Sequence, residues 1–385
     1  GSDKTASGLD GADTHSAAIM SGTSFWQDTM GWDETIWAYT SGKLPILTGL
    51  DGQDGTLPYH ISGRFFSGGG SELNPYEIST AAQLAKLAEL VNGDDPYTRI
   101  AYSYSHYKLM NDIDLSGYRE DGGWVPIGCV SDNYRSFNGT FDGNCMTITG
   151  LYINRADSDL QGLFGVIYST AVVKNLGIAQ AHVVGKKQVA GLVGLSLQGG
   201  TIEACYVTGN IRGEEEIGAI VGNNYNNGHI SNCYSAGSVS GTGYFIGGVT
   251  GDCYNSTVQN CYSTASVTGS WYVGGVAGRA SEVTVQDCTA LSPSVSGIFS
   301  FGRVVGSDTG CTFKSNYAFS GMKVNNAVVS GGVADSINGA DLNTDQIYDA
   351  NFWTTAANWD GTGWNTSIWM FEDDKLPVLA GFSGQ

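Results

Sequence analysis

The strongest constraint on the fold of this chain is a short glycine-bounded tetrad that recurs along its middle. The copies span residues 162–165, 191–194, 219–222, 248–251, 275–278 and 303–306, and their last glycines stand 27 to 29 residues apart. A second column keeps the same phase, and it consists of Leu176, Cys205, Cys233, Cys261, Cys288 and Tyr317. Two columns with one period identify a true internal repeat.

The repeat has the pattern of short strands joined by tight corners. From Cys261 to Val267, small or apolar residues occupy every second position, which is typical of a strand with one buried face. The position before the column reads Asn175, Ala204, Asn232, Asn260, Asp287 and Asn316, and Asn tolerates the left-handed backbone of a corner. No repeat contains a helical stretch. We therefore predict an all-β fold, a right-handed parallel β-helix of about seven or eight coils.

The Cys-containing column should point into the core of this solenoid as a structural ladder. Cysteine is a small and readily buried side chain. Stacked side chains that point the same way are poorly oriented for disulfides, so we expect reduced thiols. A metal site would need converging ligands at CxxC-like spacing, which the sequence lacks, so we expect neither a metal nor another cofactor.

The ends of the repeat region predict caps. Thr80 and Gln83 form the pattern of a capping box, and the apolar stripe that follows predicts a helix over about residues 80–92. We assign residues 73–100 to an N-terminal helix cap over the open core, 101–330 to the coils, and 331–385 to an aromatic C-terminal cap.

The two ends of the chain resemble one another. Phe25-Trp26, Trp32, Trp37 and the segment 43–49 match Phe352-Trp353, Trp359, Trp369 and the segment 375–381. The offset at the shared Lys-Leu-Pro motif is 375 − 43 = 332 residues. We expect residues 1–53 to be the tail of a preceding module, 54–72 a linker, and 73–385 one module of a tandem array.

These motifs resemble the GLUG-repeat family. The resemblance rests on the Gly-Leu-Phe-Gly and Gly-Leu-Val-Gly tetrads, on Asn-Cys-Tyr-Ser at 260–263, and on the lead-in segments 74–78, 111–115 and 139–143. The family occurs in exported bacterial surface proteins, including adhesin-like proteins and non-catalytic regions of immunoglobulin A peptidases. The resemblance implies an extracellular adhesion or scaffold role and transfers no catalytic residue.

Composition excludes several classes of partner. The formal net charge is −19 with 18 Lys and Arg, so nucleic acid and anionic membranes would be repelled. No run of eighteen apolar residues exists, so we expect no membrane span. The chain opens at Gly1-Ser2 without an export signal, and we expect one to have been removed from a secreted or cell-surface protein.

A search for catalytic residues favours a non-enzymatic protein. Glycoside hydrolysis needs two facing carboxylates, whereas the acids of the repeat region are scattered. Asp252 and Arg279 both follow a motif glycine, and we expect them to form an ion pair. Asp112, Asp114 and Asp142 could bind calcium, although turn capping by such carboxylates is the more common role.

One set of residues predicts binding. Tyr206, Tyr234 and Tyr262 each follow the inward Cys, so they should face outward and stack in three consecutive coils. With Trp271 and Tyr272 they form our candidate ligand-binding surface, for a host or matrix glycan or protein. The alternatives are a carbohydrate-binding or carbohydrate-processing β-helix, and an inert spacer stalk whose tyrosines only stiffen the coil.

Overall fold

A computed structural model describes residues 26–27, 30–40, 44–49, 65–129, 135–360 and 363–384. The chain forms two compact units, residues 1–67 and 68–385. Residues 1–25 of the predicted tail segment and most of the predicted linker 54–72 lie outside the described residues.

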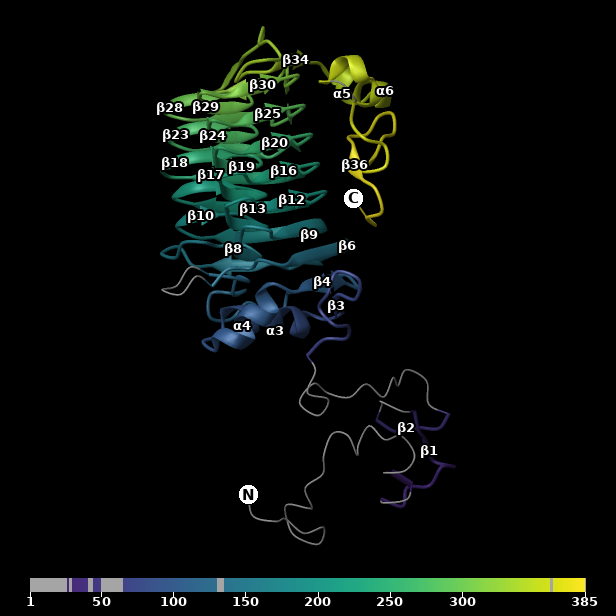
Figure 1. Cartoon of the computed structure of the whole chain (residues 1–385). Helices are drawn as coiled ribbons and strands as arrows, with labels where there is room; N and C mark the ends of the chain where they lie inside the picture. The colour runs from purple at the N-terminus through teal and green to yellow at the C-terminus, as the bar shows by residue number, and fades with distance from the viewer. Residues whose placement is uncertain are drawn as a thin grey trace. The chain divides into compact units, whose positions relative to one another are not determined.

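The larger unit is a parallel β-solenoid, so the predicted fold class is confirmed (Figure 1). Consecutive coils pair strand on strand in parallel register. The tetrads open the first strand of each coil, namely β8 (Phe164–Tyr168), β11 (Val193–Leu197), β15 (Val221–Tyr225), β19 (Thr250–Tyr254), β24 (Ala277–Ser281) and β29 (Val305–Thr309).

The second strands stack into the longest column of the solenoid. Nine of them follow one another in the described part of the chain, so the solenoid is longer than the seven or eight coils predicted. They are β3 (Tyr76–Ile78), β4 (His106–Leu109), β6 (Thr140–Thr149), β9 (Val172–Val184), β12 (Thr201–Glu203), β16 (His229–Ser231), β20 (Thr257–Gln259), β25 (Thr284–Gln286) and β30 (Thr312–Lys314).

The third and fourth strands close each coil. Third-strand positions belong to β5 (Ile113–Asp114), β7 (Tyr152–Asn154), β13 (Tyr206–Gly213), β17 (Tyr234–Gly241), β21 (Tyr262–Ser263), β22 (Ser266–Thr268), β26 (Thr289–Ala290), β27 (Ser294–Ser296), β31 (Tyr317–Phe319) and β32 (Lys323–Val324). Fourth strands are β10 (Lys187–Val189), β14 (Glu215–Gly218), β18 (Tyr244–Gly247), β23 (Trp271–Gly274) and β28 (Phe299–Gly302).

The corner before the third strand is left-handed in every repeat. Asn175, Ala204, Asn232, Asn260 and Asp287 have φ between 50° and 54°, as predicted. The sixth corner is Ser315 rather than Asn316, with φ 48°. The sixth rung of the ladder is therefore also shifted, and the prediction for Tyr317 is wrong. Tyr317 pairs with Thr289, the residue that follows the ladder cysteine Cys288, so Tyr317 is not itself a rung of the ladder.

Buried Asn316 takes the inward position instead. Its side-chain oxygen accepts a hydrogen bond from the N–H of Cys288 at 3.0 Å, and its side-chain nitrogen donates to the carbonyl of Val285 at 2.8 Å. These two bonds satisfy backbone groups at the end of the cysteine ladder, where no further cysteine follows. The polar residue Asn316 therefore occupies the last position of the column, for which the prediction from hydrophobicity named Tyr317.

The cysteine ladder is a column of thiols that are buried in the core. Cys205, Cys233, Cys261 and Cys288 are fully buried and free of disulfides. Each thiol donates to the carbonyl two residues earlier, across 3.1–3.2 Å. The proton of each thiol is thus satisfied within its own corner. Burial raises the pKa of Cys205 and Cys261, which keeps these side chains protonated.

The last glycine of each tetrad is required by close approach of the backbone. A Cβ atom at Gly278 would lie 2.4 Å from the backbone nitrogen of Ile246, and one at Gly306 would lie 2.4 Å from that of Val273. Ile246 and Val273 belong to the fourth strands β18 and β23, which lie against these glycines. The repeated motif therefore fixes how each coil rests on its neighbour.

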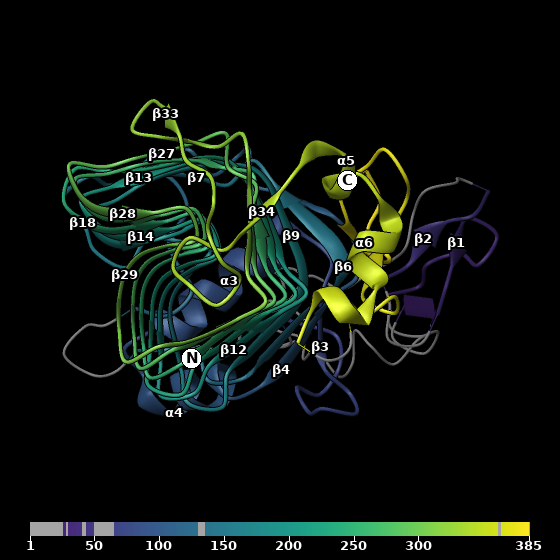
Figure 2. The same cartoon turned by 90° about the horizontal axis from the view of Figure 1, so that it is seen from above.

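Two helices close the N-terminal end of the solenoid. The predicted helix is α3 (Ala81–Asn92), and its N-cap Thr80 accepts a hydrogen bond from the N–H of Gln83. Its buried face is Leu84, Leu87, Ala88, Leu90 and Val91. Figure 2 shows α3 inside the outline of the coils, so it covers the core as expected. A second helix was not predicted, namely α4 (Pro96–Ser103), which is capped by Asp95.

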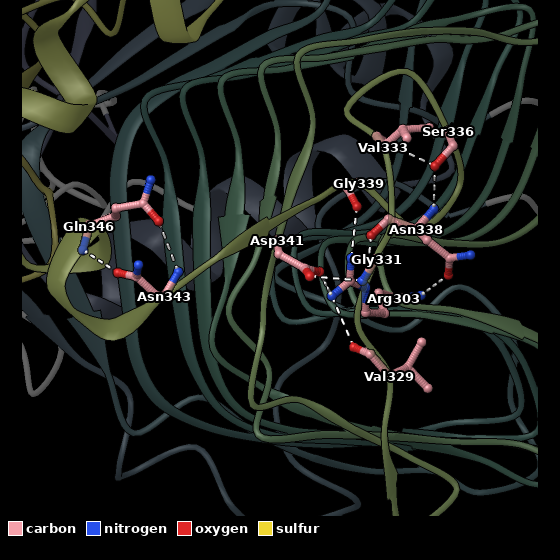
Figure 3. A network of polar contacts seen from close by, with 10 residues as sticks. All are labelled: Arg303, Val329, Gly331, Val333, Ser336, Asn338, Gly339, Asp341, Asn343 and Gln346. Carbon is pink, nitrogen blue, oxygen red and sulfur yellow. Dashed lines mark hydrogen bonds and ion pairs between the residues drawn. The ribbon is translucent and has the colours of Figure 1, made fainter.

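The other end of the solenoid is closed around one buried arginine (Figure 3). Arg303 is fully buried and donates to the backbone carbonyls of Val329, Asn338 and Gly339 at 2.8–3.0 Å. Its guanidinium also pairs with Asp341 at 2.6 Å, in β34 (Ala340–Leu342). This network holds the chain between β33 (Ala327–Val328) and β34 over the last coil.

The aromatic C-terminal segment does not cap that end, contrary to the prediction. Residues 343–384, here called the covering segment, run back along the side of the coils (Figure 1). The segment contains α5 (Thr344–Ile347), α6 (Ala350–Thr354), a short 3-10 helix (Ala356–Asn358), β35 (Trp369–Met370) and β36 (Val378–Leu379). The hydrophobic cluster that it forms includes side chains of the third strands.

The smaller unit contains one described hairpin. Strand β1 (Trp37–Ala38) pairs antiparallel with β2 (Ile46–Leu47). The rings of Trp26, Trp32 and Trp37 pack in series, with centroids 5.0 and 4.7 Å apart.

Candidate functional site

The three tyrosines predicted as a binding surface do stack, but they are buried. Ring centroids of Tyr206 and Tyr234 lie 5.1 Å apart with planes 10° from parallel, and those of Tyr234 and Tyr262 lie 5.0 Å apart at 3°. The three residues, here called the tyrosine column, are only 4%, 7% and 2% exposed. The prediction that they present an exposed ligand-binding face is wrong.

The covering segment explains this burial. Phe382 packs edge-on against Tyr206, and Trp364 and Trp369 pack against Tyr262. The hydroxyl of Tyr262 donates to the carbonyl of Pro377 at 2.7 Å. A hydrophobic face made by the coils is therefore satisfied within the chain, and the tyrosine column is part of the core rather than a site.

The other predicted binding residues, Trp271 and Tyr272, remain at the surface. Trp271 stacks between Tyr244 and Phe299, with centroid distances of 5.8 and 4.0 Å. These three residues are the first residues of β18, β23 and β28, and they pair in register. We call them the aromatic ladder. Tyr244 is 40% and Phe299 50% exposed, whereas Trp271 between them is half-buried, so the ladder is most accessible at its two ends.

A second pair of rings stands beside the ladder. Phe245 and Tyr272 stack at 5.3 Å, with planes 17° apart. Both have left-handed backbones, with φ of 65° and 59°. This conformation costs a bulky residue about 1–2 kcal/mol relative to the right-handed one. The same position is also left-handed at Gln188, Glu216 and Ser300, so only the aromatic side chains distinguish these two coils.

The ring of Phe245 also carries a cation. The guanidinium of Arg279 lies 4.0 Å from its centroid and pairs with both carboxylate oxygens of Asp252, at 2.8 and 2.6 Å. The predicted Asp252–Arg279 ion pair is therefore confirmed. Burial raises the pKa of the Asp252 carboxyl, and Arg279 opposes that effect. The pair holds Phe245 in place rather than offering a free carboxylate for chemistry.

The coils below the ladder differ in chemistry at the same positions. Lys187 and Glu215 precede Tyr244 in the column, and their charged groups pair at 2.6 Å. The wall therefore changes from a solvated ion pair to apolar rings along the solenoid. This change confines the candidate site to the coils from β18 to β28.

Two further apolar side chains are exposed at the upper end of the ladder. Ile298 is 64% and Phe301 37% exposed, next to Phe299. Strand β28 pairs with β23 on one side, and no strand in the described part of the chain pairs with its other side. Because the rings stack face to face, the ladder offers ring edges and one outer face. Such a surface suits an apolar protein partner better than a series of sugar rings.

The three carboxylates considered for calcium accept hydrogen bonds within the chain, Asp114 and Asp142 in local turns and Asp112 from a neighbouring coil. Asp114 accepts from the N–H and the hydroxyl of Ser116, and Asp112 accepts from the N–H of Thr147 at 2.7 Å. Asp142 accepts from the N–H of Asn144. Over the described residues, no group of three or more His, Cys, Asp and Glu side chains is placed to hold a metal ion.

A hollow of about 420 Å³ lies beside α4. Its lining includes the exposed rings of Tyr104 and Tyr168 and the buried amide of Asn138. The amide nitrogen of Asn138 is bonded to Ser136, but its oxygen has no hydrogen-bond partner among the described residues. This hollow could not be predicted from the sequence, because its lining residues come from three separate segments.

Comparisons with known proteins agree with this architecture. The GLUG motif matches residues 186–212 and 213–240, so these two coils are GLUG repeats. A crystal structure from Bacteroides ovatus, described as an immunoglobulin A1 protease, has the same fold. It aligns with a TM-score of 0.58 and 20% identity over 83% of this chain and 96% of that one. The chain is thus a β-solenoid in which residues 186–240 match the GLUG motif.

Two relatives match by sequence. A protein of Evansella cellulosilytica described as a Gly-rich membrane protein is 39% identical over 132 residues, which cover 32% of this chain. Halomucin of Haloquadratum walsbyi is 31% identical over 151 residues, which cover 38% of this chain. The matched regions span only 14% and 2% of these relatives' own lengths. None of the described helices is long and apolar enough to cross a membrane.

Proposed function

We propose that this chain is a non-enzymatic, cell-surface module of adhesin type, whose aromatic ladder binds a protein partner. The observation that carries the proposal is the open stack of Tyr244, Trp271 and Phe299, continued by the exposed apolar end at Ile298 and Phe301. Contiguous exposed apolar surface of this kind marks interaction sites on soluble proteins.

Two features support binding over a purely structural role. The stacked pair Phe245 and Tyr272 occupies strained backbone positions that a spacer could fill with Asn, as other corners of this chain do. Aromatic residues are also the residue type most enriched among the energetic centres of protein interfaces. The names of the two sequence relatives, a membrane protein and a mucin, support a surface location.

The test is an array of host and matrix proteins and glycans probed with the purified chain. The informative variant is Trp271→Ala with Phe299→Ala. Its control is Tyr225→Ala with Tyr254→Ala, which removes another stacked pair, at 4.9 Å, on the first strands. We expect protein binding that falls at least tenfold in the ladder variant and stays unchanged in the control. Equal binding by both variants would contradict the proposal, and no binding by the wild type would favour a spacer.

A second candidate is carbohydrate binding at the hollow beside α4. The unpaired amide oxygen of Asn138 between exposed tyrosine rings has the chemistry of a small sugar site. Glycan binding that survives the ladder variant but is lost in Asn138→Ala and Tyr104→Ala would identify this site.

A further inference from the structure

Residues 26–49 reproduce the part of the covering segment that contacts the tyrosine column. In β1 and β2, Trp37 stands opposite Leu47, whereas in β35 and β36 Trp369 stands opposite Leu379. Both pairs are related by the same offset of 332 residues, since 369 − 37 and 379 − 47 are equal. Two hairpins with one register in one chain indicate one shared local fold.

The hydrogen bonds of the two segments recur as well. In both, an Asx side chain accepts from the N–H two residues on at 2.8 Å, and its carbonyl accepts from the tryptophan N–H. The N–H groups of Thr35 and Ser367 donate to the side chains of Asp33 and Asn365. Those of Trp37 and Trp369 donate to the carbonyls of the same two residues. Those of Thr48 and Ala380 donate to the carbonyls of Ile36 and Ile368. This alignment makes Trp364, not Trp359 as predicted, the counterpart of Trp32.

The residues that touch the tyrosine column are retained in the first copy. Trp369 donates from its indole to the side-chain oxygen of Asn232 at 3.2 Å, and its counterpart is Trp37. Pro377, whose carbonyl accepts from Tyr262, corresponds to Pro45. The first copy therefore carries the groups that recognise a column of stacked tyrosines.

The two copies differ in burial. Trp364 and Trp369 are 2% and 1% exposed, whereas Trp32 and Trp37 are only half-buried. A two-stranded hairpin has little stability without a surface to pack against. The tryptophans of the first copy, Trp32 and Trp37, are therefore more accessible than their counterparts Trp364 and Trp369, which pack on the tyrosine column.

We propose that residues 26–49 are a second covering segment, which docks on the tyrosine column of another copy of this chain when that copy's own covering segment is displaced. The donor lies in one unit and the acceptor in the other, so the contact is heterologous and links chains head to tail. In the wild-type chain the covering segment wins this competition, because its docking is intramolecular.

The first test opens the acceptor. Trp369→Ala with Leu379→Ala removes the main contacts of the covering segment, and circular dichroism checks that the coils remain folded. We expect sedimentation velocity to show dimers and longer species that grow with concentration, while the wild type stays monomeric. Adding Trp37→Ala and Leu47→Ala to the opened chain should restore the monomer. Assembly that persists in this fourfold variant, or an opened chain that stays monomeric, would overturn the proposal.

A cross-link gives the second test. A Cβ at Gly381 would lie 2.9 Å from the sulfur of Cys145, so Gly381→Cys is a control that should form a disulfide within one chain. Gly49 is the counterpart of Gly381. In the opened chain, Gly49→Cys should form a disulfide with Cys145 of another copy and give a covalent dimer, which Cys145→Ser abolishes. A disulfide within one chain would contradict docking on a second copy. Should the opened chain unfold, Phe382→Ala provides a milder opening for the same readout.

Discussion

The hydroxyl of Tyr262 donates a hydrogen bond to the carbonyl of Pro377 across 2.7 Å, and 115 residues of chain separate the two. Both partners are buried, at the contact between the third strands and the covering segment. Burial raises the pKa of this hydroxyl well above its usual value, so it remains a donor at alkaline pH. The bond is one of several that hold the covering segment on the coils, together with those from Trp369 to Asn232 and from Tyr317 to Asn358.

Tyr262→Phe tests the contribution of this bond. The ring stack is kept, but the buried carbonyl of Pro377 loses its donor, so we expect the free energy of unfolding to fall by about 1–3 kcal/mol. Urea titration followed by tryptophan fluorescence measures the change, since Trp364 and Trp369 lie against Tyr262. Tyr225→Phe, at an exposed ring, is the control and should have no effect. An unchanged midpoint for Tyr262→Phe would show that water replaces the bond.

Gly177→Ala tests how the tyrosine column begins. Tyr206 leans across Gly177 to place its hydroxyl 2.9 Å from that of Thr147, and a Cβ at Gly177 would meet the ring at 2.5 Å. We expect a loss of about 1–3 kcal/mol in unfolding free energy because the ring must move. Gly117 has no atom within 4 Å of an added Cβ and is the matched control. Equal midpoints for the two alanine variants would refute this account.

The coils could be predicted from the sequence because each rule acts locally and repeats. The left-handed corners at Asn232 and Asn260, the inward cysteines and the capped helix at Thr80 follow from backbone preference and from alternation. The shift at Asn316 could not be predicted, because its place in the core depends on two hydrogen bonds to neighbouring coils.

The candidate site was predicted only in part, for a related reason. Alternation shows that Tyr206, Tyr234 and Tyr262 point away from the coil axis, but not what covers them. The covering segment reaches them across more than a hundred residues, and repeat spacing carries no information about that return. Trp271 and Tyr272 remain partly accessible, because the cluster formed by the described covering segment includes side chains of the third strands and none of the fourth. Their partner Phe299 was not predicted, because its place beside Trp271 depends on the register of β23 and β28.

Thiol labelling should divide the eight cysteines into two groups. Cys205, Cys233, Cys253, Cys261 and Cys288 are buried, whereas Cys129, Cys145 and Cys311 are partly accessible. We expect a thiol reagent to modify three cysteines in the native protein and the other five only after unfolding. Burial raises the pKa of Cys253 to about 12, so raising the pH from 7 to 9 should not speed its modification. Mass spectrometry of the labelled peptides would contradict this if any of the five reacted in the folded chain.

The Arg303 network should make the closed end of the solenoid sensitive to one substitution and to acid. Arg303→Met leaves three carbonyls without their donor and Asp341 without its partner, so we expect a loss of about 3–5 kcal/mol. Hydrogen exchange should quicken first in β29 and β31.

The acid response depends on the pKa of the Asp341 carboxyl. Partial burial raises this pKa, but the N–H groups of Gly331 and Gly332 and the Arg303 guanidinium hold it below its usual value. A carboxyl with a lowered folded pKa stabilises the fold above its unfolded pKa of about 3.9, and that stability is lost as the pH falls through the folded pKa. Wild-type protection of β31 should therefore decline below about pH 4, whereas Asp341→Asn should start lower and change less with pH. A parallel decline in both proteins would show that other carboxyls govern the acid response of this end.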